Sequence, residues 1–191
     1  LEDSALEGNE LKTLPRDLTK LKNLNFFNVG GNYLKKVPNT LWNLDHLEWL
    51  NISSNMLTEL PESMGNLQSL KELNIARNKF SKFPQVILKL KALKFLNCSE
   101  IQLRVLPKKI KELTGLEELW LRNNHLSTIP EETGDLRALR ILDLEHNPIQ
   151  KLPESIFKLD SLIKLFLRAT ELEDEEIARL KKILGKEKVK A

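Results

Sequence analysis

Proline and asparagine recur along this chain at an interval of 23 residues, and this spacing constrains the fold more than any other feature. The periodic prolines, each preceded by Leu, Val, Phe or Ile, are Pro15, Pro38, Pro61, Pro84, Pro107, Pro130 and Pro153. The periodic asparagines are Asn9, Asn32, Asn55, Asn78, Asn124 and Asn147. Chance does not produce such a period, so the chain is a stack of about eight similar units, the first of them truncated.

One unit shows how each element of the repeat is expected to fold. Leu50 and Ile52 lie two residues apart and therefore point to the same side of a short strand, toward the core. The periodic asparagine turns the chain and bonds backbone groups that a tight turn leaves unpaired. After the proline, apolar residues at a period of three, such as Met64 and Leu67, predict a short 3₁₀ or irregular turn. A single unit cannot bury its own apolar edge, so stability comes from stacking.

The full pattern Leu-x-x-Leu-x-Leu-x-x-Asn-x-Leu-x-x-Leu-Pro resembles the leucine-rich-repeat family over nearly the whole chain. The segment at 60–70 is similar to the 23-residue class, which includes leptospiral proteins and intracellular scaffolds of Ras signalling. The resemblance implies an α/β solenoid, or horseshoe. A single parallel β-sheet forms its concave face, 3₁₀ or irregular turns form its convex face, and a helix caps its C-terminal end.

The C-terminal segment is expected to form that capping helix. Acidic residues begin it at Glu173 and basic residues end it near Lys182, as the helix dipole favours. Ile177, Leu180 and Leu184 form one apolar stripe, and Gly185 is a stop signal. The order of charges resembles the closing helix of leptospiral members. We therefore divide the chain into repeats at 1–172 and a capping helix with its tail at 173–191.

Two columns of strand residues are expected to point to the concave face and to form a protein-binding surface. The columns contribute Phe26, Trp49, Glu72, Phe95 and Ile141, together with Asn51, Asn74, Asn97, Trp120, Asp143 and Phe166. Phe26 and Trp49 should be direct neighbours, and Phe95, Trp120, Ile141 and Phe166 should form a second, diagonal group. Aromatic side chains in an adaptable polar surround are typical of binding hot spots. The alternative is that aromatics simply suit strands, or that a terminal segment covers them.

Two further features allow more than one reading. Ile101 replaces the turn asparagine of its unit, so the turn there should be altered, loosened or satisfied by water. This replacement is either drift in a tolerant repeat or a functional distortion of the concave surface. On the convex side, Trp42, Leu88 and Phe157 stand where other units have small or polar residues. They indicate packing between convex turns, or else a secondary contact.

Residue types argue against other classes of function. The net charge of +3 comes from 30 basic and 27 acidic residues spread along the chain, a mixture that does not favour nucleic-acid binding. No apolar run reaches the length of a membrane span. Cys98 is predicted to be a buried apolar residue and not a nucleophile. The three histidines match no set of metal ligands. We therefore predict no enzymatic activity, no metal and no cofactor.

The leading functional hypothesis is a protein-recognition module, monomeric and not inserted in a membrane. The leptospiral resemblance implies a bacterial virulence-associated protein, secreted or at the cell surface, that binds a host cell-surface protein. Listerial internalins, a related bacterial family with a slightly shorter repeat, bind cadherin-type receptors through concave aromatics. Such an adhesion receptor is therefore a first candidate partner. The alternative is a cytoplasmic scaffold that binds a small GTPase or a signalling enzyme.

Overall fold

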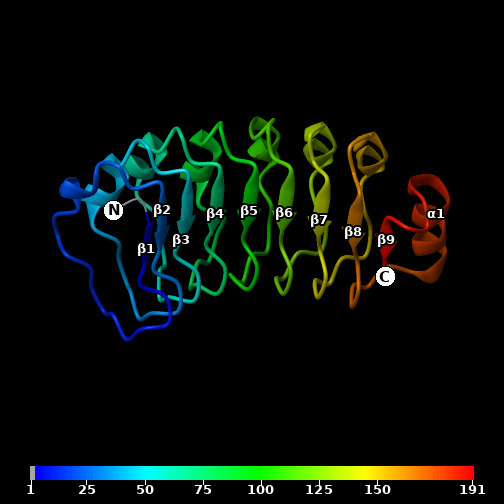
Figure 1. Cartoon of the computed structure of the whole chain (residues 1–191). Helices are drawn as coiled ribbons and strands as arrows, with labels where there is room; N and C mark the ends of the chain where they lie inside the picture. Colours follow the sequence, from blue (N-terminus) through cyan, green and yellow to red (C-terminus); the bar gives the residue numbers. More distant parts are fainter. Residues whose placement is uncertain (1–2) are drawn as a thin grey trace.

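The computed structural model describes residues 3–191, so residues 1 and 2 of the predicted first unit lie outside the described part. The described residues form one parallel sheet with nine strands in chain order (Figure 1). The strands are β1 (Asp3–Ala5), β2 (Phe26–Asn28), β3 (Trp49–Asn51), β4 (Glu72–Asn74), β5 (Phe95–Asn97), β6 (Glu118–Trp120), β7 (Ile141–Asp143), β8 (Lys164–Phe166) and β9 (Val189–Lys190). Neighbouring strands pair without any shift in the repeat, so equivalent residues of successive units stand side by side.

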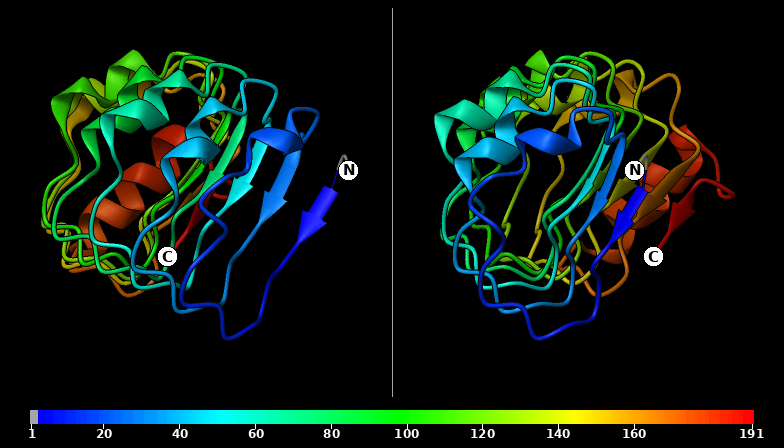
Figure 2. Two further views of the ribbon diagram at one scale, coloured as in Figure 1. Left: turned by 90° about the vertical axis from the view of Figure 1, so that its left-hand side faces the viewer. Right: turned by 60° about the vertical axis from the view of Figure 1, so that its left-hand side comes forward.

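In the described range, seven 3₁₀ turns line the side of the coil opposite the sheet (Figure 2). They span Thr19–Leu21, Asn39–Asn43, Glu62–Asn66, Gln85–Lys89, Lys108–Glu112, Glu131–Asp135 and Glu154–Lys158. From the second onward, each turn directly follows a periodic proline in extended conformation. The predicted convex turns are thus confirmed, and the proline sets their start because its fixed φ suits an extended entry.

The core is a single column, mainly of leucines and isoleucines, between the sheet and the 3₁₀ turns. Leu50 and Ile52, the inward residues of one strand region, are fully buried, as are their equivalents from the second unit onward. Each unit buries its apolar edge against the next, which confirms the predicted solenoid. Among the described residues, no helix has both the length and the apolar character needed to cross a membrane.

The periodic asparagines tie each unit to the one before it. Asn55 is buried, and its Nδ2 donates to the carbonyl oxygens of Val29 at 2.9 Å and Ile52 at 3.2 Å. Its Oδ1 accepts the backbone N–H of Leu34 at 2.9 Å. Asn32, Asn78, Asn124 and Asn147 are buried and make equivalent bonds. Asn9, in the truncated first unit, is exposed and bonds only within its own turn.

At Ile101 the turn is altered and not loosened. The side chain is fully buried in the core, and the following Gln102 takes a left-handed φ of 60°, which no other unit shows at this position. The Ile101 N–H instead donates to Oδ1 of Asn124 at 3.2 Å. In other units the periodic asparagine accepts the backbone N–H of the residue 21 positions earlier, as Asn78 does for Leu57. For Ile101 that residue is Phe80, whose N–H has no such side-chain acceptor within residues 3–191. The unit therefore replaces an amide network with apolar burial.

The C-terminal end is closed by the helix α1 (Asp174–Leu184) and by strand β9. Leu180 is fully buried, and Ile177 and Leu184 pack against the core, as the apolar stripe predicts. Gly185 ends the helix with a φ of 107°, in the region that favours glycine. Strand β9 was not predicted: the tail turns back after the helix and adds Val189 to the sheet opposite Leu165.

Candidate functional site

Six large apolar side chains lie on the outer, concave face of the sheet: Phe26, Trp49, Phe95, Trp120, Ile141 and Phe166. Each is half-buried, and none of them belongs to the hydrophobic core. The strand alternation explains their position, because the residue next to each of them in its strand, a leucine or Phe27, points inward. Large apolar side chains in contact with solvent on an otherwise polar surface are the usual sign of a contact site.

The first aromatic pair is formed by Phe26 and Trp49 on the adjacent strands β2 and β3. Their rings are stacked with centroids 3.9 Å apart and an interplanar angle of 11°. This contact is the direct neighbour relation expected from the sequence. Such a stack contributes about 0.5–1.5 kcal/mol beyond area burial and holds both rings in one orientation.

The second pair joins Trp120 on β6 to Phe166 on β8, with ring centroids 6.1 Å apart and an interplanar angle of 26°. Trp120 Nε1 donates to a carboxylate oxygen of Glu118 at 3.0 Å, which fixes the indole further. Ile141 lies on the strand between them. Phe95 shares no aromatic stack with any residue in the range 3–191. Of the predicted diagonal group, the structure shows one aromatic pair, with Ile141 on the strand between its two members.

The asparagines between the two pairs are less open than expected. Asn51 is buried, and Asn74 and Asn97 are half-buried. The Oδ1 of each accepts the backbone N–H two residues later, from Ser53, Ala76 and Ser99 at 3.0–3.1 Å. Their Nδ2 groups donate to no protein atom in the described range, and none is a buried unpaired atom. The column therefore offers donors to a partner but few acceptors.

Asp143 differs most from the expected solvent-facing position, because it is only 2% exposed. It pairs in register with both Trp120 and Phe166, whose rings close over it. Its Oδ1 accepts the backbone N–H of Glu145 at 2.8 Å. Burial, and to a lesser extent the charge of Glu145, raises the pKa of Asp143 above its ordinary value. Asp143 therefore supports the second aromatic pair from below, and a direct contact with a partner needs that pair to move.

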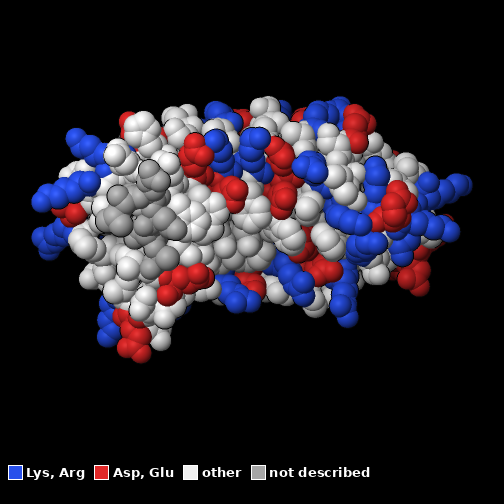
Figure 3. Space-filling model, in the orientation of Figure 1, with Lys and Arg blue, Asp and Glu red and all other residues white. Residues whose placement is uncertain are grey.

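Glu72 and the half-buried Glu118 complete the first column of the concave face. Glu72 is exposed on β4, and within residues 3–191 neither carboxylate takes part in an ion pair. By contrast, the acids at the strand entries are paired: Glu48 with Lys71 at 2.7 Å, and Glu117 with Lys94 at 3.0 Å. Figure 3 shows acidic and basic side chains mixed over the middle of this face and mainly basic ones over its C-terminal third.

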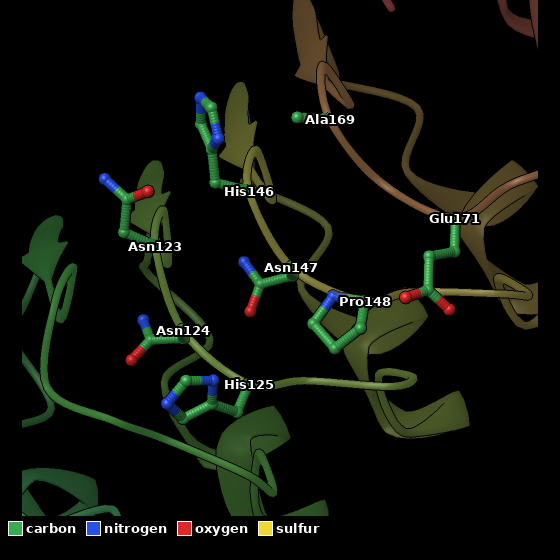
Figure 4. A pocket seen from close by; sticks show the side chains of 8 residues that line it. All are labelled: Asn123, Asn124, His125, His146, Asn147, Pro148, Ala169 and Glu171. Carbon is green, nitrogen blue, oxygen red and sulfur yellow. The ribbon is translucent and has the colours of Figure 1, made fainter.

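Groups that could carry catalysis are poorly placed for it. Cys98 is fully buried, as predicted, and burial raises the pKa of its thiol, so the reactive thiolate is disfavoured. A shallow pocket of about 520 Å³ is lined by His125, His146 and Glu171. In Figure 4 the imidazole rings of His125 and His146 point away from each other, and Glu171 lies on the other side of the pocket from both. Over the described range, no cluster of three His, Cys, Asp or Glu could hold a metal ion.

The convex residues singled out in the sequence pack inward. Trp42 and Leu88 are buried in the core. Phe157 is half-buried against the core, and the guanidinium of Arg179 on α1 lies 5.0 Å from its ring centroid. These contacts match packing between convex turns and, for Phe157, a link to the capping helix.

The chain matches two family descriptions, "Leucine-rich repeat region" over residues 39–124 and "Leucine rich repeat" over residues 102–149. A solved leucine-rich-repeat protein of Leptospira interrogans is 31% identical and covers 100% of the chain with a TM-score of 0.81. The chain is a leucine-rich-repeat protein. The resemblance to leptospiral members is confirmed as well. This leucine-rich-repeat protein spans about half, 54%, of the length of the leptospiral structure.

Two plant receptors have similar structures. One is the leucine-rich-repeat ectodomain of the membrane receptor kinase GASSHO1/SCHENGEN3 from Arabidopsis thaliana, in complex with CASPARIAN STRIP INTEGRITY FACTOR 2. It is 30% identical, with a TM-score of 0.71, over 84% of this chain and 20% of the receptor chain. The other is the peptide hormone receptor RGFR1 in complex with RGF2, with 30% identity, a TM-score of 0.72, and coverage of 84% and 27%. No match was found among curated proteins.

Proposed function

We propose that this leucine-rich-repeat protein is a protein-recognition module that binds its partner on the concave face. The observation that carries the proposal is the set of six large apolar side chains held outside the core, four of them in two aromatic pairs. Rigid aromatic anchors next to free amide donors are the groups that dominate binding energy in protein interfaces. Two similar receptors were solved in complex with the ligands that their names give, which agrees with this role.

The finer proposal is that the protein is exported or surface-associated in a bacterium and binds a host cell-surface protein. The similarity to a Leptospira interrogans protein over the whole chain supports this choice of organism group. A cadherin-type adhesion receptor is the class to test first. We propose that the module acts as a monomer, without cofactor and without catalysis. Cys98 is buried, and the His, Asp and Glu side chains of the described residues form no cluster of three that could hold a metal ion.

The test is binding of purified protein to intact epithelial cells, with unlabelled protein as competitor. The double variant Trp49→Ala/Trp120→Ala removes one ring from each aromatic pair. The matched control Tyr33→Ala/Val105→Ala removes two exposed apolar side chains outside the strands. We expect saturable binding that is lost in the first variant and kept in the second, with circular dichroism and urea unfolding showing that all three proteins are folded.

Two outcomes would contradict the proposal at different levels. Equal binding by the wild type and the tryptophan variant would place the contact away from the concave face. Absence of binding by the wild-type protein would reject a host cell-surface receptor and favour the cytoplasmic scaffold, which binds a small GTPase or a signalling enzyme with the same face.

A further inference from the structure

Four cationic side chains surround Phe166 at the C-terminal end of the concave face. Lys164 begins its strand β8, and Arg168 lies in the turn two residues after Phe166. On β9, Val189 is buried opposite Leu165, so its neighbour Lys190 points to the concave side. Lys188 lies directly before this strand, and its carbonyl oxygen accepts the backbone N–H of Leu165. Lys190 is the register partner of Phe166. Figure 3 shows the resulting concentration of basic side chains over this end of the sheet.

None of these four cations has an ion-pair partner in the part of the chain that the structure describes. In residues 3–191, Lys164 Nζ donates only to the carbonyl oxygen of Glu187, at 3.1 Å. Neighbouring cations are paired: Arg122 contacts Glu145 at 2.8 Å and Arg140 contacts Glu117 at 3.6 Å. A group of unpaired like charges around an apolar side chain attracts an anionic group from a partner.

The charge changes sign toward the middle of the same face. Glu72 on β4 and Glu118 on β6 carry the unpaired acids of the first column, whereas Lys164 and Lys188 continue that column on β8 and beside β9. Strands in a sheet are about 4.8 Å apart, so the acids lie roughly 10 and 19 Å from the β8 cations along the solenoid axis. A long polyanion that follows the axis would meet these carboxylates, whereas a short acidic group would not.

We infer that the partner presents a peptide segment with an acidic residue next to a bulky apolar residue. The acidic side chain binds among Lys164, Arg168 and Lys190, and the apolar side chain packs on the Trp120–Phe166 pair. A basic residue about 10 Å along the segment faces Glu118. This inference rests on the proposed recognition function and gives the chemistry and the direction of the bound segment.

The experiment is selection of a phage-displayed library of random dodecapeptides on the immobilised full chain. Binding of the selected peptides is then measured by fluorescence anisotropy with three variants. Arg168→Glu/Lys190→Glu reverses the charge of two exposed cations beside Phe166. The control Lys108→Glu/Lys109→Glu makes the same change in net charge at two exposed cations of a convex turn. The third variant is Trp49→Ala/Trp120→Ala. Fluorescent oligothymidine and phosphatidylserine vesicles serve as polyanionic probes.

We expect enriched peptides to carry Asp or Glu next to a bulky apolar residue. Their affinity should fall about tenfold in Arg168→Glu/Lys190→Glu, stay unchanged in the convex control, and recover in that variant when the peptide acid is replaced by Lys. Affinity should also fall with added salt.

Three outcomes would overturn the inference. The first is a library that yields no binder. The second is a set of selected peptides that ignore the charge reversal but lose binding in the tryptophan variant, which keeps concave recognition and rejects the acidic segment. The third is stronger binding to oligothymidine or to the vesicles than to the peptides, abolished by the same charge reversal, which assigns the cations to a nucleic acid or a membrane surface.

Discussion

Asn55 illustrates how one residue type holds successive units together. Its amide satisfies a backbone N–H of the preceding unit and carbonyl groups of both units, all within a buried turn. The need for these bonds could be predicted from the 23-residue spacing, because a tight buried turn leaves such groups unpaired. The consequence of Ile101 could not be predicted from the sequence. Gln102 takes a left-handed φ, and Oδ1 of Asn124 accepts the N–H groups of both Ile101 and Leu103, only when the units stack.

The residue-scale prediction concerns Asp143, whose carboxylate is buried beneath two aromatic rings. Its pKa is raised, so the folded state binds the proton more readily than the unfolded chain, and stability decreases as the pH rises through that pKa. Asp143→Asn keeps the acceptor for Glu145 N–H and removes the charge. We expect the variant to unfold at higher urea concentration than the wild type at pH 7, with the difference shrinking toward about pH 3.

Asp45→Asn, at an exposed position in a loop, serves as the control and should leave the urea midpoint nearly unchanged at both pH values. A stabilisation by Asp143→Asn that is equally large at both pH values would show that the buried charge is not its cause.

At the scale of elements, the 3₁₀ turns on the convex side approach one another very closely near the C-terminal end. Gly134 in the turn Glu131–Asp135 faces Ser155 in the next turn, and a Cβ on Gly134 would overlap the Ser155 backbone. The sequence shows that a small residue occurs here, but the reason appears only when two convex turns are packed together. The close approach also leaves the hydroxyls of Thr133 and Ser155 buried without a partner.

We predict that Gly134→Ala lowers the free energy of unfolding by about 1–3 kcal/mol, because backbone atoms of the neighbouring turn must move. Gly115→Ala is the matched control: its Cβ would meet only carbonyl oxygens at 3.8 and 3.9 Å, so it should be neutral or slightly stabilising. Urea unfolding followed by circular dichroism measures both. Equal effects of the two substitutions would disprove the packing explanation.

For the whole molecule, stability depends on covering the C-terminal end of one continuous core. At the C-terminal end, Leu180 of α1 is buried, and β9 completes the sheet beside β8. In a stack of units, the loss of an end contact destabilises the nearest units most, because each unit contacts only its neighbours.

We predict that Leu180→Ala lowers the free energy of unfolding by about 2–4 kcal/mol. In hydrogen exchange, the amides of β8 and β9 should exchange faster while those of β3 and β4 keep their protection. Ile183→Ala, on the exposed side of the same helix, should leave both regions unchanged. Uniformly faster exchange over all strands would mean that the chain unfolds as one unit and that the end effect is absent.

The sequence by itself determined the repeat, the sheet with its inward and outward residues, the convex turns and the capping helix. These follow from spacing, because a period of 23 residues places equivalent side chains in register whatever their surroundings. It also identified Phe26 and Trp49 as neighbours, since a repeat in register puts them on adjacent strands.

Only the tertiary structure decided which outward residues remain open to a partner. Trp120 and Phe166 reach each other across a strand and bury Asp143, and the tail returns as β9 to place Lys188 and Lys190 beside Phe166. Neither result is encoded in the repeat, because side-chain length, ring orientation and the path of a non-repeating tail are settled by packing between units.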